Sequence, residues 1–290
     1  MKSCAIRILV AAGAFCAALL ALRFALRGLD WPTLRTQIHR LDWRWLALAA
    51  VFDVASYATQ GLRWRLLLDG SKLWQTTRAT YAGLFVNELV PLRPGEAVRA
   101  WMAARDLDVG LWTIVPTMLS ERLMDGFWLA LALIGALAVA PLPAVAAHAV
   151  GIVSGVVTVG LIVALALGGR VRSGLLHPGA LFMSAVFLIA QGLAFWSVLP
   201  ASQISLGLLA AGVVMIVVRL DTMIPGAPAN LGTYRFATVM GLSLFGVPQA
   251  QAAAFSLVVF TVLTIPLMVL GLCACLSAGV TWRRVRELAV

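Results

Sequence analysis

Three ionisable side chains lie close together inside a long apolar stretch of this chain. Glu121 and Asp125 are four positions apart, and Arg122 precedes Asp125 by three. On a helix, Glu121 and Asp125 would share a face, and Arg122 would be close enough to Asp125 to pair with it. Because each charge costs roughly 2.5–3.5 kcal/mol at the centre of a membrane helix, we expect all three to be paired. Further expected partners come from a nearby segment: Arg93, Glu96 and Arg99.

Two segments, residues 87–99 and 221–235, interrupt the apolar sequence in the same way. Each contains an amide or carboxylate, two apolar residues, a P-x-x-P core, a glycine and a downstream arginine. Matched Gly/Pro interruptions in the two halves of a membrane protein indicate a transport site at a repeat interface. We therefore expect the two segments to face one cavity. The candidate substrate-binding residues are Asn87, Arg93, Glu96, Arg99, Glu121, Arg122, Asp125, Arg219, Asp221, Asn230 and Arg235.

The same segments predict an anion site. A helix that begins near Gly95 or Gly232 would direct the positive end of its dipole into the cavity. Arg93, Arg99 and Arg235 would add formal positive charge, so a phosphate or phosphodiester is the favoured ligand. The alternative is an internal salt-bridge network that only holds the broken helices in place.

A polar stripe runs through the apolar residues 45–68. Its members recur at helical spacings of three, four and seven, so they must face protein or water rather than lipid. These residues are Asp53, Ser56, Tyr57, Gln60, Arg63 and Trp64. By itself we interpret this stripe as structural.

The composition predicts a membrane protein. Apolar residues make up 62% of the 290 residues, the mean hydropathy is +0.96, and several windows approach twenty residues with few charges. The expected spans are roughly Ile6–Leu26, Trp45–Leu68, Leu73–Leu89, Trp112–Ala140, Ala149–Leu167, Ala180–Leu199, Ser205–Val218 and Ala250–Ala278. Two shorter pieces, Glu96–Ala104 and Thr233–Phe245, complete two broken or re-entrant helix pairs. We expect an all-α polytopic membrane helical bundle, with the first span a retained anchor rather than a signal peptide.

The spans also align as an internal repeat within a single transmembrane domain, residues 1–290. Unit one covers about residues 45–140, a linker span about 149–167, and unit two about 180–278. A single linker span would invert the second unit relative to the first. Basic residues flank the outermost spans and favour cytoplasmic termini: Lys2, Arg7, Arg283, Arg284 and Arg286. The arginines within residues 29–44 conflict with this orientation unless that segment lies along the membrane surface.

The net charge of +10 does not predict nucleic-acid binding, because the arginines lie beside membrane spans and anionic lipid is the expected counter-charge. Four cysteines and three histidines are too scattered to form a ligand set, and no nucleophile or phosphate-loop motif occurs. We therefore expect no metal, no cofactor and no catalytic residue.

At the polar motifs the sequence resembles the transmembrane region of lysylphosphatidylglycerol synthase and its stand-alone flippase-like relatives. The ordered motifs are Gly83 to Asn87, Pro91-x-x-x-Gly95-Glu96-x-x-Arg99, Glu121-Arg122-x-x-Asp125, Pro225-x-x-Pro228-x-x-x-Gly232 and Phe245-Gly246-Val247. The resemblance covers about residues 10–280 and implies translocation of lipids or lipid-linked head groups between leaflets. It does not carry over aminoacyl transfer, for which two-domain relatives use a soluble domain. Thr233-Tyr234-Arg235 is a departure from many relatives, which have an acidic residue after this glycine.

We expect a protein of the bacterial inner membrane that moves an anionic phospholipid or a polyprenyl-phosphate-linked lipid. Two alternatives stay open. One is a membrane enzyme that modifies a lipid head group with Glu121 or Asp125 as general base. The other is a non-catalytic partner of a membrane glycosyltransferase or synthase.

Overall fold

The computed structural model describes residues 35–36, 38–90, 94–139, 155–160, 162–163, 166, 169–223 and 231–280. Several predictions concern residues outside this set: the first span, most of the linker span and of the segment 29–44, and the flanking basic residues at both ends. Arg93 and Asn230 also lie outside the described residues.

The described residues form helices and no strand, which confirms the all-α bundle. The first group is α3 (Trp43–Leu67), α4 (Leu73–Leu89), α5 (Gly95–Leu107) and α6 (Leu111–Val139). A short helix that the sequence did not predict, α8 (Gly169–Leu175), precedes the second group. This second group is α9 (Pro178–Ala201), α10 (Leu208–Met223), α11 (Leu231–Ser243) and α12 (Gln249–Ala278).

The helices of the two groups have matching lengths. They contain 25, 17, 13 and 29 residues in the first group and 24, 16, 13 and 30 in the second. The half-length third helix in each group is the expected result of a Gly/Pro break. The predicted repeat accounts for this pattern, and the repeat and its inversion stay predictions.

One boundary was predicted too early. The span expected to end at Val218 continues as α10 to Met223, so Arg219 and Asp221 are helical. The nearest strong breaker is Pro225, which disfavours helical geometry in the residue before it.

Local signals explain several helix ends. The Asp42 side chain accepts a hydrogen bond from the Arg44 N–H (2.9 Å) at the start of α3. His177 Nδ1 accepts one from the Ala180 N–H (3.1 Å), and Pro178 occupies the first turn of α9. At the other end of the chain, α12 stops at Gly279, whose φ of 63° is left-handed.

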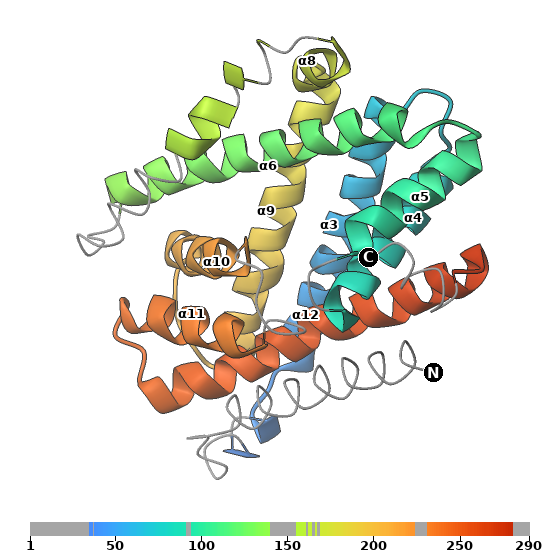
Figure 1. The fold of residues 1–290 in the computed structure, drawn as a ribbon. Helices are drawn as coiled ribbons and strands as arrows, with labels where there is room; N and C mark the ends of the chain where they lie inside the picture. Colours follow the sequence, from blue (N-terminus) through green and yellow to red (C-terminus); the bar gives the residue numbers. More distant parts are fainter. Residues whose placement is uncertain are drawn as a thin grey trace, which may run out of the picture.

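The helices α3 and α9 pack side by side through the centre of the molecule (Figure 1). The helices α6 and α12 cross this pair on opposite sides, above and below it in the view of Figure 1. The α4–α5 hairpin packs on α3, α6 and α12, and the α10–α11 pair packs on α9, α6 and α12. Both groups therefore meet along the α3–α9 contact.

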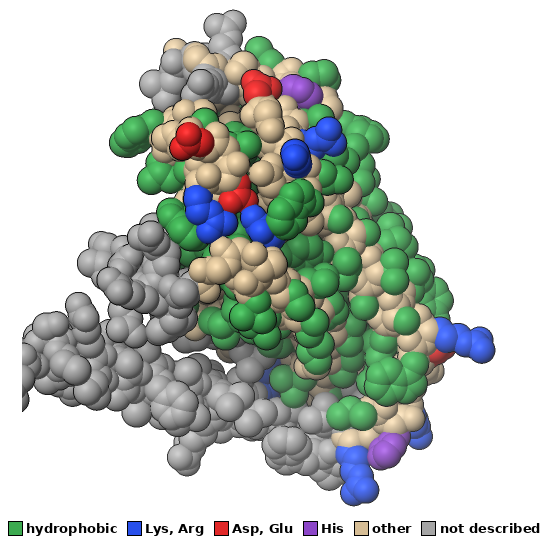
Figure 2. Space-filling view, turned by 90° about the vertical axis from the view of Figure 1, so that its right-hand side faces the viewer, with side chains coloured by type: hydrophobic (Ala, Val, Ile, Leu, Met, Phe, Trp, Pro, Cys, Tyr) green, Lys and Arg blue, Asp and Glu red, His purple; other side chains and the backbone are tan. Residues whose placement is uncertain are grey.

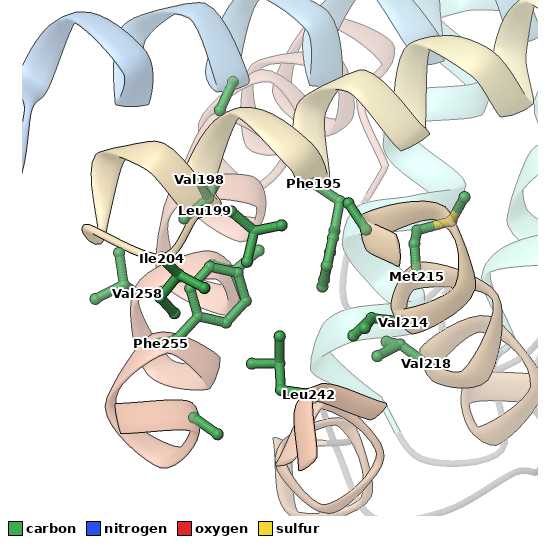
Figure 3. Close-up of a cluster of buried hydrophobic side chains, with 14 of the residues drawn as sticks. Phe195, Val198, Leu199, Ile204, Val214, Met215, Val218, Leu242, Phe255 and Val258 are labelled. Carbon is green, nitrogen blue, oxygen red and sulfur yellow. The ribbon is translucent and has the colours of Figure 1, made fainter. Parts of the chain in front are cut away.

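Two large apolar cores and a smaller one around Met124 stabilise this arrangement. In the largest one, Phe195 of α9 meets Phe255 of α12 edge to face, with ring centroids 5.7 Å apart (Figure 3). Val214 of α10 and Leu242 of α11 complete the contacts of the second group. The other large core joins α3, α4, α5 and the start of α6 to the end of α12.

Much of the outer surface is apolar, which suits contact with lipid. Figure 2 shows a broad band of hydrophobic side chains, with charged residues near the upper end and the lower right edge of this face. The exposed apolar residues include Leu131 and Ile134 of α6, Phe182 and Ile189 of α9, and Leu276 of α12. By length and composition, α9 and α12 could each cross a membrane.

The α4–α5 hairpin depends on a contact between two glycines. A Cβ atom added to Gly95 would lie 1.8 Å from the carbonyl oxygen of Gly83. The Gly95 N–H donates to Asn87 Oδ1 (2.8 Å), which satisfies a donor in the first turn of α5. α5 therefore packs tightly against α4, and this brings residues of both helices to the same place.

We expect Gly95→Ala to destabilise the protein by about 1–3 kcal/mol, because the added methyl group forces the hairpin apart. Thermal unfolding in detergent, followed by tryptophan fluorescence, measures the loss. Gly135→Ala is the matched control, since nothing lies within 4 Å of a Cβ built there on α6. Equal melting temperatures for the two variants would contradict the close packing of the hairpin.

Candidate functional site

A buried arginine connects three helices. Arg63 of α3 is fully inaccessible, and its Nε donates to Glu121 Oε1 of α6 (3.0 Å). Its two Nη groups form a fork to the Asp125 carboxylate, and Nη1 also donates to Ser184 Oγ of α9 (2.9 Å). One guanidinium thereby binds α3 to α6 and α9.

The second oxygen of Glu121 binds another arginine. Arg99 Nη2 of α5 donates to Glu121 Oε2 at 2.5 Å. The Arg99 guanidinium lies 3.8 Å from the ring centroid of Trp64, whose Nε1 donates to Thr117 Oγ1 (3.0 Å). Glu121, which is 1% exposed, is therefore held between Arg63 and Arg99.

The outer part of the network is an ion pair between Arg122 and Glu96. Their side chains are 52% and 36% exposed, in contrast to the buried inner pairs. Arg122 approaches Asp125 only to 3.9 Å, so the predicted pairing of these two residues is present as a long, secondary contact. Arg63 is the main partner of Asp125, because an arginine from a neighbouring helix can present its fork to both carboxylate oxygens.

A cavity of about 490 Å³ adjoins this network. All four helices of the first group and all four of the second contribute side chains to it. The first broken segment contributes Asn87, Glu88 and Glu96 to the lining, and the second contributes Tyr234. Both segments therefore supply side chains to one cavity, and their placement on opposite walls stays a prediction.

The structure places the predicted site residues in three groups. Five line the cavity: Asn87, Glu96, Arg122, Asp125 and Arg219. Three described side chains are not among the lining residues: Arg99, Glu121 and Arg235. The side chains outside the described part are Arg93, Asp221 and Asn230.

Two of the groups expected to bind an anion already have partners within the protein. The half-helices begin where expected, α5 at Gly95 and α11 at Leu231. However, the Gly95 N–H is bonded to Asn87, and the Arg99 guanidinium is committed to Glu121. Arg99 is therefore part of an internal salt-bridge network, as the alternative interpretation expects. The arginines that line the cavity, within the described residues, are Arg122 and Arg219.

The sequence reasoning missed part of the cavity wall. Asp53, Tyr57 and Gln60 of α3 line the cavity, with Gln191 of α9 beside them. For the three α3 residues, the signal was the polar stripe of residues 53–64, which we interpreted as structural. The structural interpretation fits Arg63, but it is incomplete for Asp53, Tyr57 and Gln60, because these three line the cavity.

No group of three His, Cys, Asp or Glu side chains that could hold a metal ion occurs within the described ranges. The charged groups among the described residues of the site are carboxylates and guanidinium groups, whose chemistry is the binding of charged or hydrogen-bonding ligands.

Comparison with known families gives one match. A family model described as "Lysylphosphatidylglycerol synthase TM region" matches residues 5–178 and 169–271. A search of the curated proteins and a search of the solved structures found no match.

Glu121→Gln should destabilise the protein by about 3–5 kcal/mol, because it leaves two buried guanidinium groups short of counter-charge. Glu96→Gln is the matched control, and we expect a change of at most about 1 kcal/mol, since its ion pair is partly exposed. Thermal unfolding of both variants in detergent measures the difference. Equal losses of stability would show that the buried pairs are no more important than the exposed one.

Proposed function

Because the chain belongs to the family of the lysylphosphatidylglycerol synthase transmembrane region, we propose that it transports a lipid between membrane leaflets. It is a membrane protein of the lysylphosphatidylglycerol synthase and flippase kind. The proposed substrate is an anionic phospholipid or a polyprenyl-phosphate-linked lipid, and the proposed location is a bacterial inner membrane.

The main support is the two-sided chemistry of the cavity. Arg122 and Asp125 lie on its polar wall, while Leu84, Met215 and Leu263 contribute apolar surface. A lipid presents the same two chemistries, a charged head group and a hydrocarbon chain. The volume of about 490 Å³ is typical of a small-molecule site and suits a head group with the adjoining part of its tails.

Arg122 is well placed to bind a phosphate. Its ion pair with Glu96 is partly exposed, and such pairs contribute only about 0–1 kcal/mol, so exchange for a phosphate has a low cost. A guanidinium can bind two phosphate oxygens at once. The buried bonds from Arg63 and Arg99 to Glu121 can stay in place during this exchange, because they involve other groups.

The geometry gives less support to head-group chemistry. A general base must come within about 2.6–3.2 Å of the proton that it removes. Both oxygens of Glu121 already accept hydrogen bonds from arginines, and this side chain does not line the cavity. Asp125 lines the cavity, but both of its oxygens accept from Arg63. Translocation is therefore the function that these contacts favour.

The test is transport of a fluorescent phosphatidylglycerol in liposomes that contain the purified protein. Dithionite added outside destroys the fluorescence of outer-leaflet lipid, so its decay reports exchange between leaflets. Arg122→Gln and Arg219→Gln should each slow exchange at least about tenfold, because a charge-assisted hydrogen bond is worth roughly 1.5–3 kcal/mol.

Arg65→Gln is the control, since Arg65 is an exposed arginine on α3 away from the cavity lining, and it should keep the wild-type rate. Exchange no faster than in protein-free liposomes would refute transport of this lipid class. A lipid product of altered mass would instead favour the enzyme alternative.

A further inference from the structure

We propose that Asp53 and Gln60 form a subsite for the hydroxyl groups of a lipid head group, such as glycerol or a sugar. This inference rests on the proposed transport function and narrows its substrate to lipids whose phosphate carries a polyhydroxylated group.

Two buried acceptors carry the inference. Asp53 is 2% exposed and Gln60 is 4% exposed, and both line the cavity. Asp53 Oδ2 and Gln60 Oε1 have no hydrogen-bond partner among the described residues. Ser56, between them on α3, has partners: its Oγ donates to the Asp53 carbonyl oxygen (2.7 Å) and accepts from Gln191 Nε2 (3.1 Å). Buried polar atoms are almost always paired with protein or ordered water, so these two acceptors need donors from the cavity, and the hydroxyl groups of a ligand can supply them.

The spacing of the acceptors indicates several donors rather than one. Asp53 and Gln60 are seven residues apart, which places them on one face of α3 and roughly 10 Å apart along its axis. A single ammonium group cannot reach both positions. A sugar or inositol ring carries hydroxyl groups on opposite sides and can donate a hydrogen bond to each acceptor. The two hydroxyl groups of a phosphate-linked glycerol are on adjacent carbons and span a shorter distance.

Aromatic rings adjoin the two acceptors. Tyr57 lies on α3 between them in sequence, and its ring centroid is 6.3 Å from that of Phe187 on α9. Both rings line the cavity, as does Tyr234 of α11. Aromatic rings offer apolar surface to the C–H groups of a sugar or glycerol, while the acceptors take its hydroxyl protons.

A cationic group lies next to this subsite. The Arg219 guanidinium is 5.4 Å from the ring centroid of Phe187. Phe187 is also the ring that lies next to Tyr57. A phosphate at Arg219 would therefore place an attached hydroxylated group near Asp53 and Gln60. The arrangement fits a phosphodiester in which the phosphate links the lipid to a polyol head group.

The charge balance agrees with a neutral head group beyond the phosphate. Among the described side chains, the carboxylates in or behind the cavity wall are Asp53, Glu88, Glu96, Glu121 and Asp125, and the guanidinium groups are Arg63, Arg99, Arg122 and Arg219. These five negative and four positive groups nearly cancel, so hydroxyl groups rather than a strong net charge match the α3 side of the cavity.

The experiment measures binding of four short-chain lipids to the purified full chain by isothermal titration. They are dihexanoyl phosphatidylglycerol, phosphatidylinositol, phosphatidic acid and phosphatidylethanolamine. A polyoxyethylene detergent is required, because maltoside and glucoside detergents carry sugar head groups. We expect the two hydroxylated lipids to bind at least about fivefold tighter than phosphatidic acid, as two additional hydrogen bonds imply. Comparing these two lipids distinguishes a sugar-like ring from glycerol as the source of the hydroxyl groups.

Asp53→Asn and Gln60→Leu should each weaken binding of the hydroxylated lipids about fivefold and leave phosphatidic acid binding unchanged. Thr59→Val is the matched control on α3, because Thr59 does not line the cavity and bonds only to the Ser56 carbonyl oxygen. The melting temperature of each variant shows whether it is folded.

Three results would overturn the subsite. The first is an equal loss for phosphatidic acid and the hydroxylated lipids in both variants. The second is tightest binding of phosphatidylethanolamine, which would assign the acceptors to an ammonium group. The third is wild-type protein that binds none of the four lipids, and this result alone would also overturn transport of an anionic phospholipid as the proposed function.

Discussion

The bond network around the Arg63 guanidinium is the interaction on which the rest of the polar interior depends. A fully buried charge is tolerated only when it is paired and its donors are used. Arg63 meets this requirement with Glu121 and Asp125 of α6 and Ser184 of α9. Because these partners come from two other helices, the requirement also fixes how α3, α6 and α9 pack together.

The side chains of the ion-pair network become more exposed from the interior toward the cavity. Glu121 is 1% exposed, Asp125 is 18% exposed, and Glu96 and Arg122 are 36% and 52% exposed. Buried pairs are costly to break, whereas exposed pairs exchange partners at little cost. The inner pairs can therefore act as a rigid frame, while the outer pair can open for a ligand without disturbing it.

The cavity lies where the two groups of helices meet, with side chains from every helix of both groups in its wall. The half-helices α5 and α11 both contribute to it, through Glu96 and Tyr234. Non-helical backbone at membrane depth is tolerated only where protein or a water-filled cavity surrounds it. The helices on either side of both breaks contribute to this one cavity, which agrees with the constraint and brings polar residues of the two groups together.

Properties within a single helix could be predicted from the sequence. Apolar length and Gly/Pro breaks placed the helices, and α4 was predicted with its observed bounds, Leu73–Leu89. Tertiary structure alone decided which charges pair. Arg63 binds Glu121 across 58 residues, while Arg122, three positions from Asp125, turns mainly to Glu96. Helical periodicity determines which side chains share a face of one helix. The partner across an interface depends on the crossing and register of two helices, which the packing of the whole bundle sets.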